Sequence, residues 1–251
     1  MSVGINLGIP PLRSGGSVLL STPRAAHWDF SRMDILRQDI AGSIPVTASG
    51  QPIGRVLDLS GNGRNLVAEA ANSRPTFYVP GQNLRPCAQM VVDDYLVWSG
   101  GAVEASAGWY LICVGFNAQA NDDWRSLCAV GGGSPFIEHY LTQSGGNTTH
   151  FWNVASGISG RQSSLSVFTG VSTPGFRQLR INGSPRAGSA QAFSSVNLSR
   201  VSLGARIDST WAGNPILQGW IGEMALFRAA EVNPAKIAEI EQELLWKWSI
   251  G

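Results

Sequence analysis

The feature that most constrains the fold is a series of short apolar segments that recur at roughly ten- to fifteen-residue intervals from residue 109 onward. The first, "WYLICVGFNA" at 109–118, is apolar at both alternations, which predicts a strand covered on both faces. It is followed by "SLCAVGG", "FIEHYLTQ", "THFWNVA", "SLSVFTGV", "FRQLRING", "RVSLGAR" and "GWIGEMALFR", each bounded by Gly, Pro, Ser or Asn. This spacing predicts antiparallel meanders or Greek keys rather than βαβ units.

Composition agrees with many short strands joined by tight turns. Hydrophobic residues make up 43% of the 251-residue chain, enough to build a core, whereas charged residues make up only 14%, below the roughly 25% of an average soluble domain. The net charge of +1 provides no field that would attract nucleic acid. We therefore expect no nucleic-acid partner. No window approaches about 18 uninterrupted apolar residues, so we expect no membrane insertion either.

The three cysteines, Cys87, Cys113 and Cys128, are an odd number without CxxC spacing. We expect all three to be unpaired and the chain to fold in a reducing cytoplasm. The first residues show no basic segment followed by an apolar stretch, so no signal peptide is expected.

The stretch "NPAKIAEIEQELLWKWSIG" predicts the one helix of the chain. Asn233 is placed to cap it, and Pro234 suits its first turn. Glu243 and Lys247 have the spacing of an i,i+4 ion pair on one face. A second face, expected to pack on the sandwich, carries Ile237, Ile240, Leu244 and Trp248. The tryptophans that we expect in the core are Trp109, Trp220, Trp246 and Trp248.

Residues 1–26 differ from the rest, and we interpret them as an extended arm before a domain at 27–251. Pro-Pro enforces an extended chain, and the Ser-Gly-Gly that follows allows it to turn. A frayed terminus is the alternative, but apolar residues alternate here with small ones, which favours an arm that adds an edge strand or docks on a neighbouring subunit. The docking residues would be Ile5, Leu7, Ile9, Pro10 and Pro11.

Four segments together resemble the concanavalin A-like lectin/glucanase superfamily, in the laminin G-like form found in bacteriophage and prophage structural proteins. They are "HWDFSRMDILRQDIAGSIPVT" with the turn "GQPIGRVLDLSGNG", the Ser-Arg-Pro-Thr step at 73–76, "VVDDYLVWSG", and the closing strand and helix. In the turn, Asn62-Gly63 tolerates positive φ, and Asp58 can accept hydrogen bonds from the turn amides. The resemblance implies an antiparallel jelly-roll β-sandwich with one C-terminal helix. The family's Phe-Asp-Gly before the Asp-Asp pair is replaced here by "AQMVV".

Catalytic patterns are missing from the sequence. Glucanases on this scaffold carry a Glu-x-Asp-x-x-Glu motif, and no Glu-x-Asp occurs in the chain. Glu138 and His139 are adjacent in one strand and would point to opposite faces. There is neither a Gly-x-Ser-x-Gly elbow nor a zinc-like ligand spacing. We therefore expect no enzyme and no cofactor, with calcium at Asp122 and Asp123 as a weak candidate that a polar hairpin loop explains equally well.

Sugar binding is the chemistry that the aromatic residues favour. Flat aromatic rings stack on sugars while polar side chains bond the hydroxyls. Core or interface packing is the competing interpretation, because Trp, Tyr and Arg are enriched there too. The candidate sugar-binding residues are Trp124, Arg125, His139, Tyr140, His150, Trp152 and Trp211.

The resemblance implies a non-enzymatic virion protein of a tailed phage: a decoration, head-fibre or tail-appendage subunit. Its partners would be other virion proteins, bound through the arm, and a homo-oligomer such as a trimer is expected. It would be located in the virion, after assembly in the bacterial cytoplasm. The alternative is a carbohydrate-binding module that recognises a bacterial surface glycan, and a glycoside hydrolase ranks third.

Overall fold

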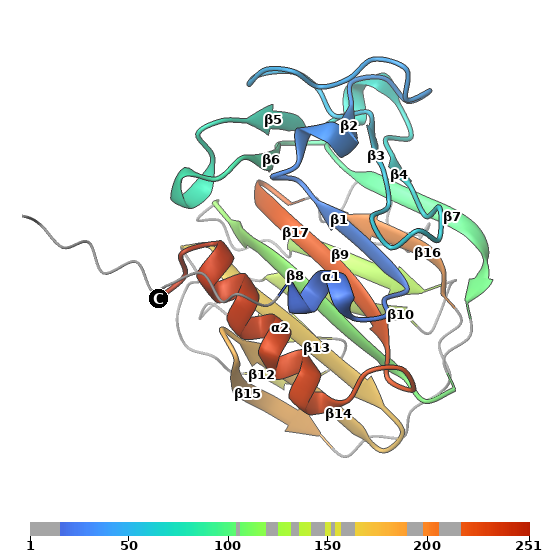
Figure 1. The fold of residues 1–251 in the computed structure, drawn as a ribbon, viewed down its shortest axis with the longest axis vertical. Helices are drawn as coiled ribbons and strands as arrows, with labels where there is room; N and C mark the ends of the chain where they lie inside the picture. The colour runs from blue at the N-terminus through green and yellow to red at the C-terminus, as the bar shows by residue number, and fades with distance from the viewer. Residues whose placement is uncertain are drawn as a thin grey trace, which may run out of the picture.

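The computed structural model describes residues 16–103, 106–118, 125–131, 136–141, 149–151, 154–156, 164–189, 198–205 and 217–251. These residues form two stacked antiparallel sheets, with one long helix lying on the outer face of the first sheet (Figure 1). The predicted all-β sandwich with a C-terminal helix is therefore confirmed. Within the described ranges, no helix has the length and apolar character needed to cross a membrane.

The first sheet has eight strands among the described residues, in the order β15-β14-β13-β8-β17-β6-β5, and β1 pairs with β17. Its strands are β1 (Ala26–Asp29), β5 (Thr76–Tyr78), β6 (Cys87–Met90), β8 (Trp109–Asn117), β13 (Ser166–Thr173), β14 (Phe176–Ile181), β15 (Ser184–Ser189) and β17 (Gly219–Arg228).

The second sheet has nine strands in the described part, in the order β12-β11-β10-β9-β16-β7-β4-β3-β2. They are β2 (Leu36–Arg37), β3 (Arg55–Val56), β4 (Leu66–Val67), β7 (Leu96–Val103), β9 (Arg125–Gly131), β10 (Phe136–Leu141), β11 (Thr149–Phe151), β12 (Val154–Ser156) and β16 (Leu198–Leu203). Short 3₁₀ helices lie in the connections, at η1 (Met33–Ile35), η2 (Ala71–Ser73) and η3 (Gln82–Leu84).

Two hydrophobic cores explain the layers. The main core fills the space between the sheets, and a second core lies between the outer face of the first sheet and the helices α1 (Val18–Ser21) and α2 (Pro234–Lys247). Strand β8 contributes to both, and all nine of its residues are buried. This confirms the prediction that the strand at 109–118 is covered on both faces. None of the three cysteines forms a disulfide bond with another, as predicted, and all three are buried.

The Asn-Gly turn of the opening segment is anchored as expected. Asp58 accepts hydrogen bonds from the backbone amides of His27, Ser60 and Arg64, at 3.0, 2.9 and 3.0 Å. The side chain of Asn62 donates to the carbonyl of Ala25 at 3.0 Å. The turn therefore fastens to the start of β1 as well as to itself.

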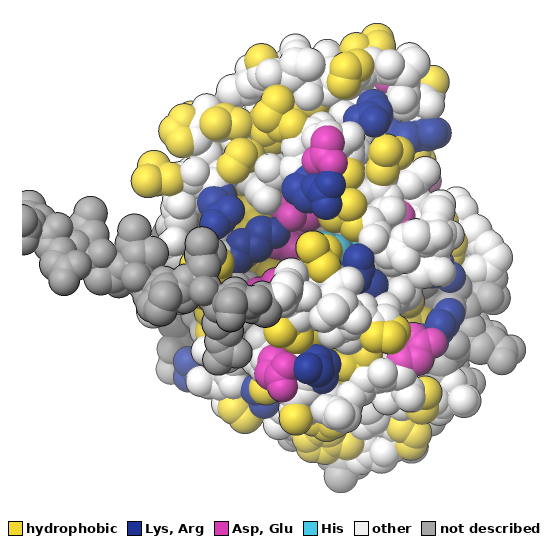
Figure 2. All heavy atoms as spheres, viewed as in Figure 1, with side chains coloured by type: hydrophobic (Ala, Val, Ile, Leu, Met, Phe, Trp, Pro, Cys, Tyr) yellow, Lys and Arg dark blue, Asp and Glu magenta, His cyan; other side chains and the backbone are white. Residues whose placement is uncertain are grey.

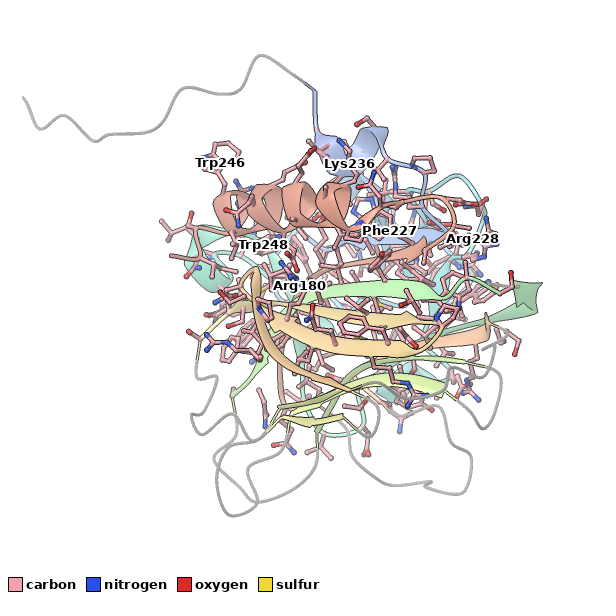
Figure 3. All side chains as sticks on the ribbon, turned by 90° about the horizontal axis from the view of Figure 1, so that it is seen from below. Arg180, Phe227, Arg228, Lys236, Trp246 and Trp248 are labelled. Atoms are coloured by element: carbon pink, nitrogen blue, oxygen red, sulfur yellow. The ribbon has the colours of Figure 1, made fainter. Side chains whose placement is uncertain are left out.

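Helix α2 begins as predicted. The side chain of Asn233 accepts a hydrogen bond from the amide of Lys236 at 2.9 Å, and Pro234 occupies the first turn. The predicted stripe faces the first sheet, since Ile237, Ile240, Leu244 and Trp248 are all at most 2% exposed. Figure 3 shows Trp248 directed toward the sheet and Trp246 away from it.

Two predictions about tryptophans and one about an ion pair were wrong. Trp246 is 50% exposed because it lies on the face of α2 opposite to the sheet, and Trp220 is only partly buried. The expected Glu243–Lys247 pair does not form. Lys247 instead bonds carboxylates on β1 and β17, while Glu243 bonds residues 17–19.

The described part of the expected arm, residues 16–26, packs against the sandwich. It forms α1 and the first residue of β1, and α1 lies beside α2 (Figure 1). Leu19 is 2% exposed, its amide donates to Glu243 at 2.9 Å, and the hydroxyl of Ser17 bonds the same carboxylate. Because Leu19 is buried in the second core, this segment lies against the sandwich. Ile5, Leu7, Ile9, Pro10 and Pro11 lie outside the described residues.

Candidate functional site

Four of the seven predicted sugar-binding residues fall on three adjacent strands of the nine-stranded sheet. Arg125 begins β9, His139 and Tyr140 lie in β10, and His150 lies in β11. Tyr140 is the register partner of His150. In the ladder between β9 and β10, Arg125 pairs with Leu141, the last residue of β10. The sheet therefore brings together backbone positions that are up to 25 residues apart in the sequence.

The other predicted ligand residues lie outside the part of the chain that the structure describes. These are Trp124, Trp152 and Trp211, and the two calcium candidates, Asp122 and Asp123. Over the described residues, no group of three His, Cys, Asp or Glu side chains could hold a metal ion.

A polar network that the sequence did not predict lies on the outer face of the same sheet. Leu66, Leu96 and Val201 are in the core between the sheets, so alternate positions on β4, β7 and β16 face outward. There the carboxylate of Glu69 accepts a hydrogen bond from the Tyr95 hydroxyl and another from Nη2 of Arg200, both at 2.9 Å.

This network is solvent-accessible and preorganised. The side chains of Glu69 and Arg200 are 46% and 32% exposed. Partial burial and the hydrogen bond to Glu69 raise the pKa of the Tyr95 hydroxyl, which therefore remains a donor at neutral pH. A partly exposed ring beside an arginine and a carboxylate is suited to holding a polyhydroxylated ligand. The only sequence signal for this network is Tyr95, within "VVDDYLVWSG". Glu69 and Arg200 are 131 residues apart, so no local pattern connects them.

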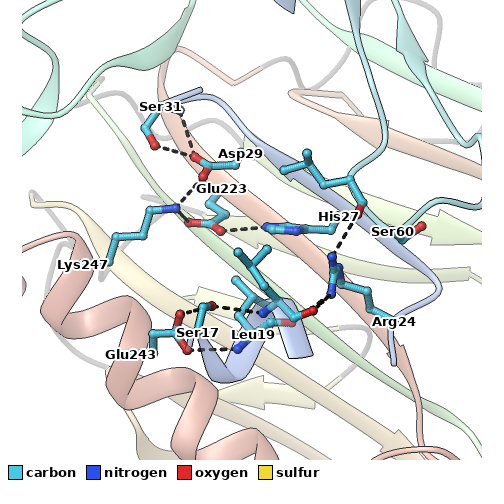
Figure 4. Close-up of polar contacts among 12 residues, drawn as sticks. Ser17, Leu19, Arg24, His27, Asp29, Ser31, Ser60, Glu223, Glu243 and Lys247 are labelled. Carbon is cyan, nitrogen blue, oxygen red and sulfur yellow. Dashed lines mark hydrogen bonds and ion pairs between the residues drawn. The ribbon is translucent and has the colours of Figure 1, made fainter. Parts of the chain in front are cut away.

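A second polar cluster is buried between the first sheet and α2 (Figure 4). Nζ of Lys247 lies 2.6 Å from Oδ2 of Asp29 and 2.7 Å from Oε2 of Glu223. Asp29 and Glu223 are register partners on β1 and β17, which turns both side chains to the same face. His27 Nε2 lies 2.8 Å from Glu223 Oε1, and the indole N–H of Trp248 donates to Oε2 at 3.0 Å.

This cluster contains two converging carboxylates, which the search for Glu-x-Asp spacing could not find. Burial by itself raises the pKa of Glu223, but the hydrogen bond from His27 and the charge of Lys247 outweigh it and lower the pKa to about 2. A glycosidase needs a carboxyl group that stays protonated and an open path to the substrate. Glu223 is ionised, and Asp29 and Glu223 are only 4% and 1% exposed. The geometry is that of a structural ion network.

His27 takes part in this network as a hydrogen-bond donor. With Glu223 ionised, its Nε2 must carry the proton that bonds the carboxylate. Its Nδ1 is buried and has no hydrogen-bond partner in the described part of the chain. The space-filling view shows Lys and Arg side chains next to acidic side chains near the centre of this face of the molecule (Figure 2).

Comparisons with known proteins identify the fold. No family model and no curated protein matches the chain. Among solved structures, a GH54 α-L-arabinofuranosidase soaked with a cyclic sulfate inhibitor aligns with a TM-score of 0.66 at 12% identity, over 90% of this chain and 63% of that one. The sialidase of Trypanosoma rangeli, in complex with the inhibitor DANA, aligns with a TM-score of 0.57 at 10% identity, over 94% of this chain and 36% of that one.

A third match covers nearly the whole of its own chain. Domain 4 of AbnA, a GH43 extracellular arabinanase from Geobacillus stearothermophilus, was solved in complex with arabinotriose. It aligns with a TM-score of 0.56 at 13% identity, over 88% of this chain and 99% of that domain. At these identities the likeness establishes the sandwich fold alone. This chain spans less than two thirds of the arabinofuranosidase.

These comparisons correct the interpretation of the chain as a phage virion subunit. The three matches reported above are an arabinofuranosidase, a sialidase and an arabinanase domain, and none of the three is a phage decoration or tail protein. The interpretation was wrong because it rested on sandwich motifs, and proteins that act on glycosides share this sandwich. A fold by itself does not specify the function placed on it.

Proposed function

We propose that the chain is a carbohydrate-binding domain without hydrolytic activity, which binds a polysaccharide on the outer face of its nine-stranded sheet. The observation that carries the proposal is the register of β9, β10 and β11. It makes Tyr140 and His150, two residues chosen for sugar chemistry, direct partners on neighbouring strands, whereas Arg125 pairs one position further on, with Leu141.

Two further observations support this function. The network of Glu69, Tyr95 and Arg200 adds an exposed carboxylate, hydroxyl and guanidinium on the outer face of the same sheet, and these are the groups that bond sugar hydroxyls. The likeness to an arabinanase domain solved with arabinotriose supports a glycan as the class of ligand.

The absence of hydrolysis is part of the proposal. The converging carboxylates of the described residues, Asp29 and Glu223, are both bonded to Lys247 and buried. Neither can approach a glycosidic bond without opening the second core.

The proposal is tested on a glycan array with the full chain and with the variants Tyr140→Ala, His150→Ala, Trp124→Ala and Trp152→Ala. Removing a central aromatic contact should weaken binding at least about tenfold. The matched control is Phe176→Ala, which removes a 42% exposed ring from β14 of the other sheet and should leave binding unchanged.

Hydrolysis is checked on every polysaccharide that binds, by measuring new reducing ends. We expect none above the buffer control. No binding on a broad array would refute the proposed function, and sustained release of reducing ends would refute its non-enzymatic part.

A further inference from the structure

Two arginines face each other across the short pair of strands at one edge of the nine-stranded sheet. Arg37 of β2 is the register partner of Arg55 of β3. The second register pair of β2 and β3 consists of Leu36 and Val56, and both residues are fully buried in the core between the sheets. Side chains alternate along a strand, so both arginines lie on the outer face, with Cβ atoms about 5 Å apart.

Neither guanidinium forms an ion pair with a carboxylate of the described residues, although, beside the hydrogen bond from Arg32, the charge of Arg37 helps to lower the pKa of the nearby Asp34. Nη1 of Arg37 donates only to the backbone carbonyls of Asp34 and Leu36, both at 2.9 Å. Nε of Arg55 is buried without a hydrogen-bond partner, and no ion pair to either arginine occurs among the described residues. In Figure 2, dark-blue side chains lie where Figure 1 places β2 and β3.

A third arginine lies next to this pair. Arg74 donates to the carbonyl of Ala71 at 2.8 Å and to the carbonyl of Gln38, the residue after Arg37, at 3.1 Å. It too has no carboxylate within ion-pair distance in the part of the chain that the structure describes. Three arginines therefore lie at or next to this edge, and the hydrogen bonds of Arg37 and Arg74 go to backbone carbonyls.

The carboxylates in the neighbouring segments are already bonded elsewhere. Asp34 is held by the guanidinium of Arg32. Asp39 accepts hydrogen bonds from the amides at 43–44, which lower its pKa to about 2. Glu69 bonds the network described above. Asp34 therefore offsets the charge of Arg37 only in part, because its carboxylate is hydrogen-bonded to Arg32, and no described carboxylate forms an ion pair with Arg55.

Directly opposed like charges destabilise an antiparallel pair, and a bound anion relieves that repulsion. Arginine forks match the planar geometry of a carboxylate. We propose that Arg37 and Arg55, with Arg74 beside them, form a subsite for the carboxylate of an acidic, uronic-acid-containing polysaccharide. This inference rests on the proposed function and names its class of ligand. The subsite lies on the same outer face as the sugar site, because Arg55 pairs with Val67 of β4, and Val67 with Val97 of β7.

The test measures binding of the full chain to polygalacturonate, to the same polymer with its carboxylates methyl-esterified, and to a neutral galactan. We expect tighter binding to the free acid than to its ester. The double variant Arg37→Gln/Arg55→Gln should lose roughly 10- to 100-fold of the affinity for the free acid, the value expected for charge-assisted hydrogen bonds. Arg55→Lys, which keeps the charge but loses the fork, should also weaken binding.

The control is Arg228→Gln, which removes one positive charge from the Arg228–Glu231 pair at the end of β17 and should leave binding unchanged. Thermal unfolding of the double variant should be unchanged or shifted upward, because a repulsion is removed, whereas a purely structural role predicts a lower midpoint. Equal losses in Arg228→Gln, or none in the double variant, would overturn the subsite. Binding to galactan and esterified polymer alone overturns this inference and leaves the proposed function intact, and no binding to any polymer overturns both.

Discussion

At the scale of single residues, Lys247 joins helix α2 to strands β1 and β17. Its ammonium bonds Asp29 of β1 and Glu223 of β17 (Figure 4). Burial lowers the pKa of Lys247, but the two carboxylates outweigh burial, so its pKa is raised and it stays charged. A buried carboxylate interacts more strongly with a cation than an exposed one does, which is why Lys247 bonds this pair rather than Glu243.

Replacing this lysine should therefore be costly. In Lys247→Met, the two carboxylates stay buried without a counter-charge, and we expect the free energy of unfolding to fall by about 3–5 kcal/mol. Lys236→Met on the same helix removes only a surface pair with Glu239, whose side chains are 40% and 50% exposed, and should cost less than about 1 kcal/mol. Urea unfolding of both variants makes the comparison; equal losses would mean that the buried network contributes no more than a surface pair.

At the scale of elements, the packing of α2 on the first sheet depends on a close approach. Gly222 of β17 leaves room for the indole ring of Trp248, and a Cβ added at Gly222 would lie 2.6 Å from that ring. Trp248 is fully buried, so it has no free space into which to move. The amphipathic pattern of α2 was readable from the sequence, whereas the need for a glycine opposite its last turn was not.

Gly222→Ala should therefore separate the helix from the sheet. We expect a loss of about 1–3 kcal/mol in the free energy of unfolding, the usual cost of overpacking a core. Gly101→Ala in β7 is the matched control, since an added Cβ there meets nothing within 4 Å. Near-ultraviolet circular dichroism should report the displaced tryptophan in the first variant only. Unchanged spectra and stability for Gly222→Ala would contradict the close packing.

At the scale of the whole molecule, the buried network couples folding to pH. The folded-state pKa of Glu223 is lowered from 4.5 to about 2. For a carboxylate with a lowered pKa, the stabilisation is fully present above the unfolded-state value and is lost as the pH falls through the folded-state value. The loss should therefore occur between about pH 4.5 and about pH 2.

In Glu223→Gln this titration is absent, so the free energy of unfolding should depend less steeply on pH within that window. The difference in slope should integrate to at most about 3 kcal/mol, the linkage value for a shift of this size. Chemical denaturation at closely spaced pH values measures it, and the difference between the two proteins cancels the titration of all shared groups. Parallel curves for the two proteins would show that Glu223 is not strongly coupled to folding.

The sequence by itself determined the class of fold and several of its elements. The buried strand at 109–118, the cap at Asn233, the stripe facing the sheet and the turn around Asp58 all depend on interactions within a few residues, and such patterns are visible along the chain. The sugar-binding candidates on β9–β11 were chosen by residue type, and only the register made Tyr140 and His150 neighbours.

Tertiary structure decided the rest, because it depends on which strands lie side by side. Asp29 meets Glu223 across 194 residues of sequence, Glu69 meets Arg200 across 131, and Arg37 meets Arg55 through a two-residue ladder. No local periodicity encodes these pairings, since they arise from the strand order of two sheets. Charge and burial at these positions, and hence their chemistry, follow from that order.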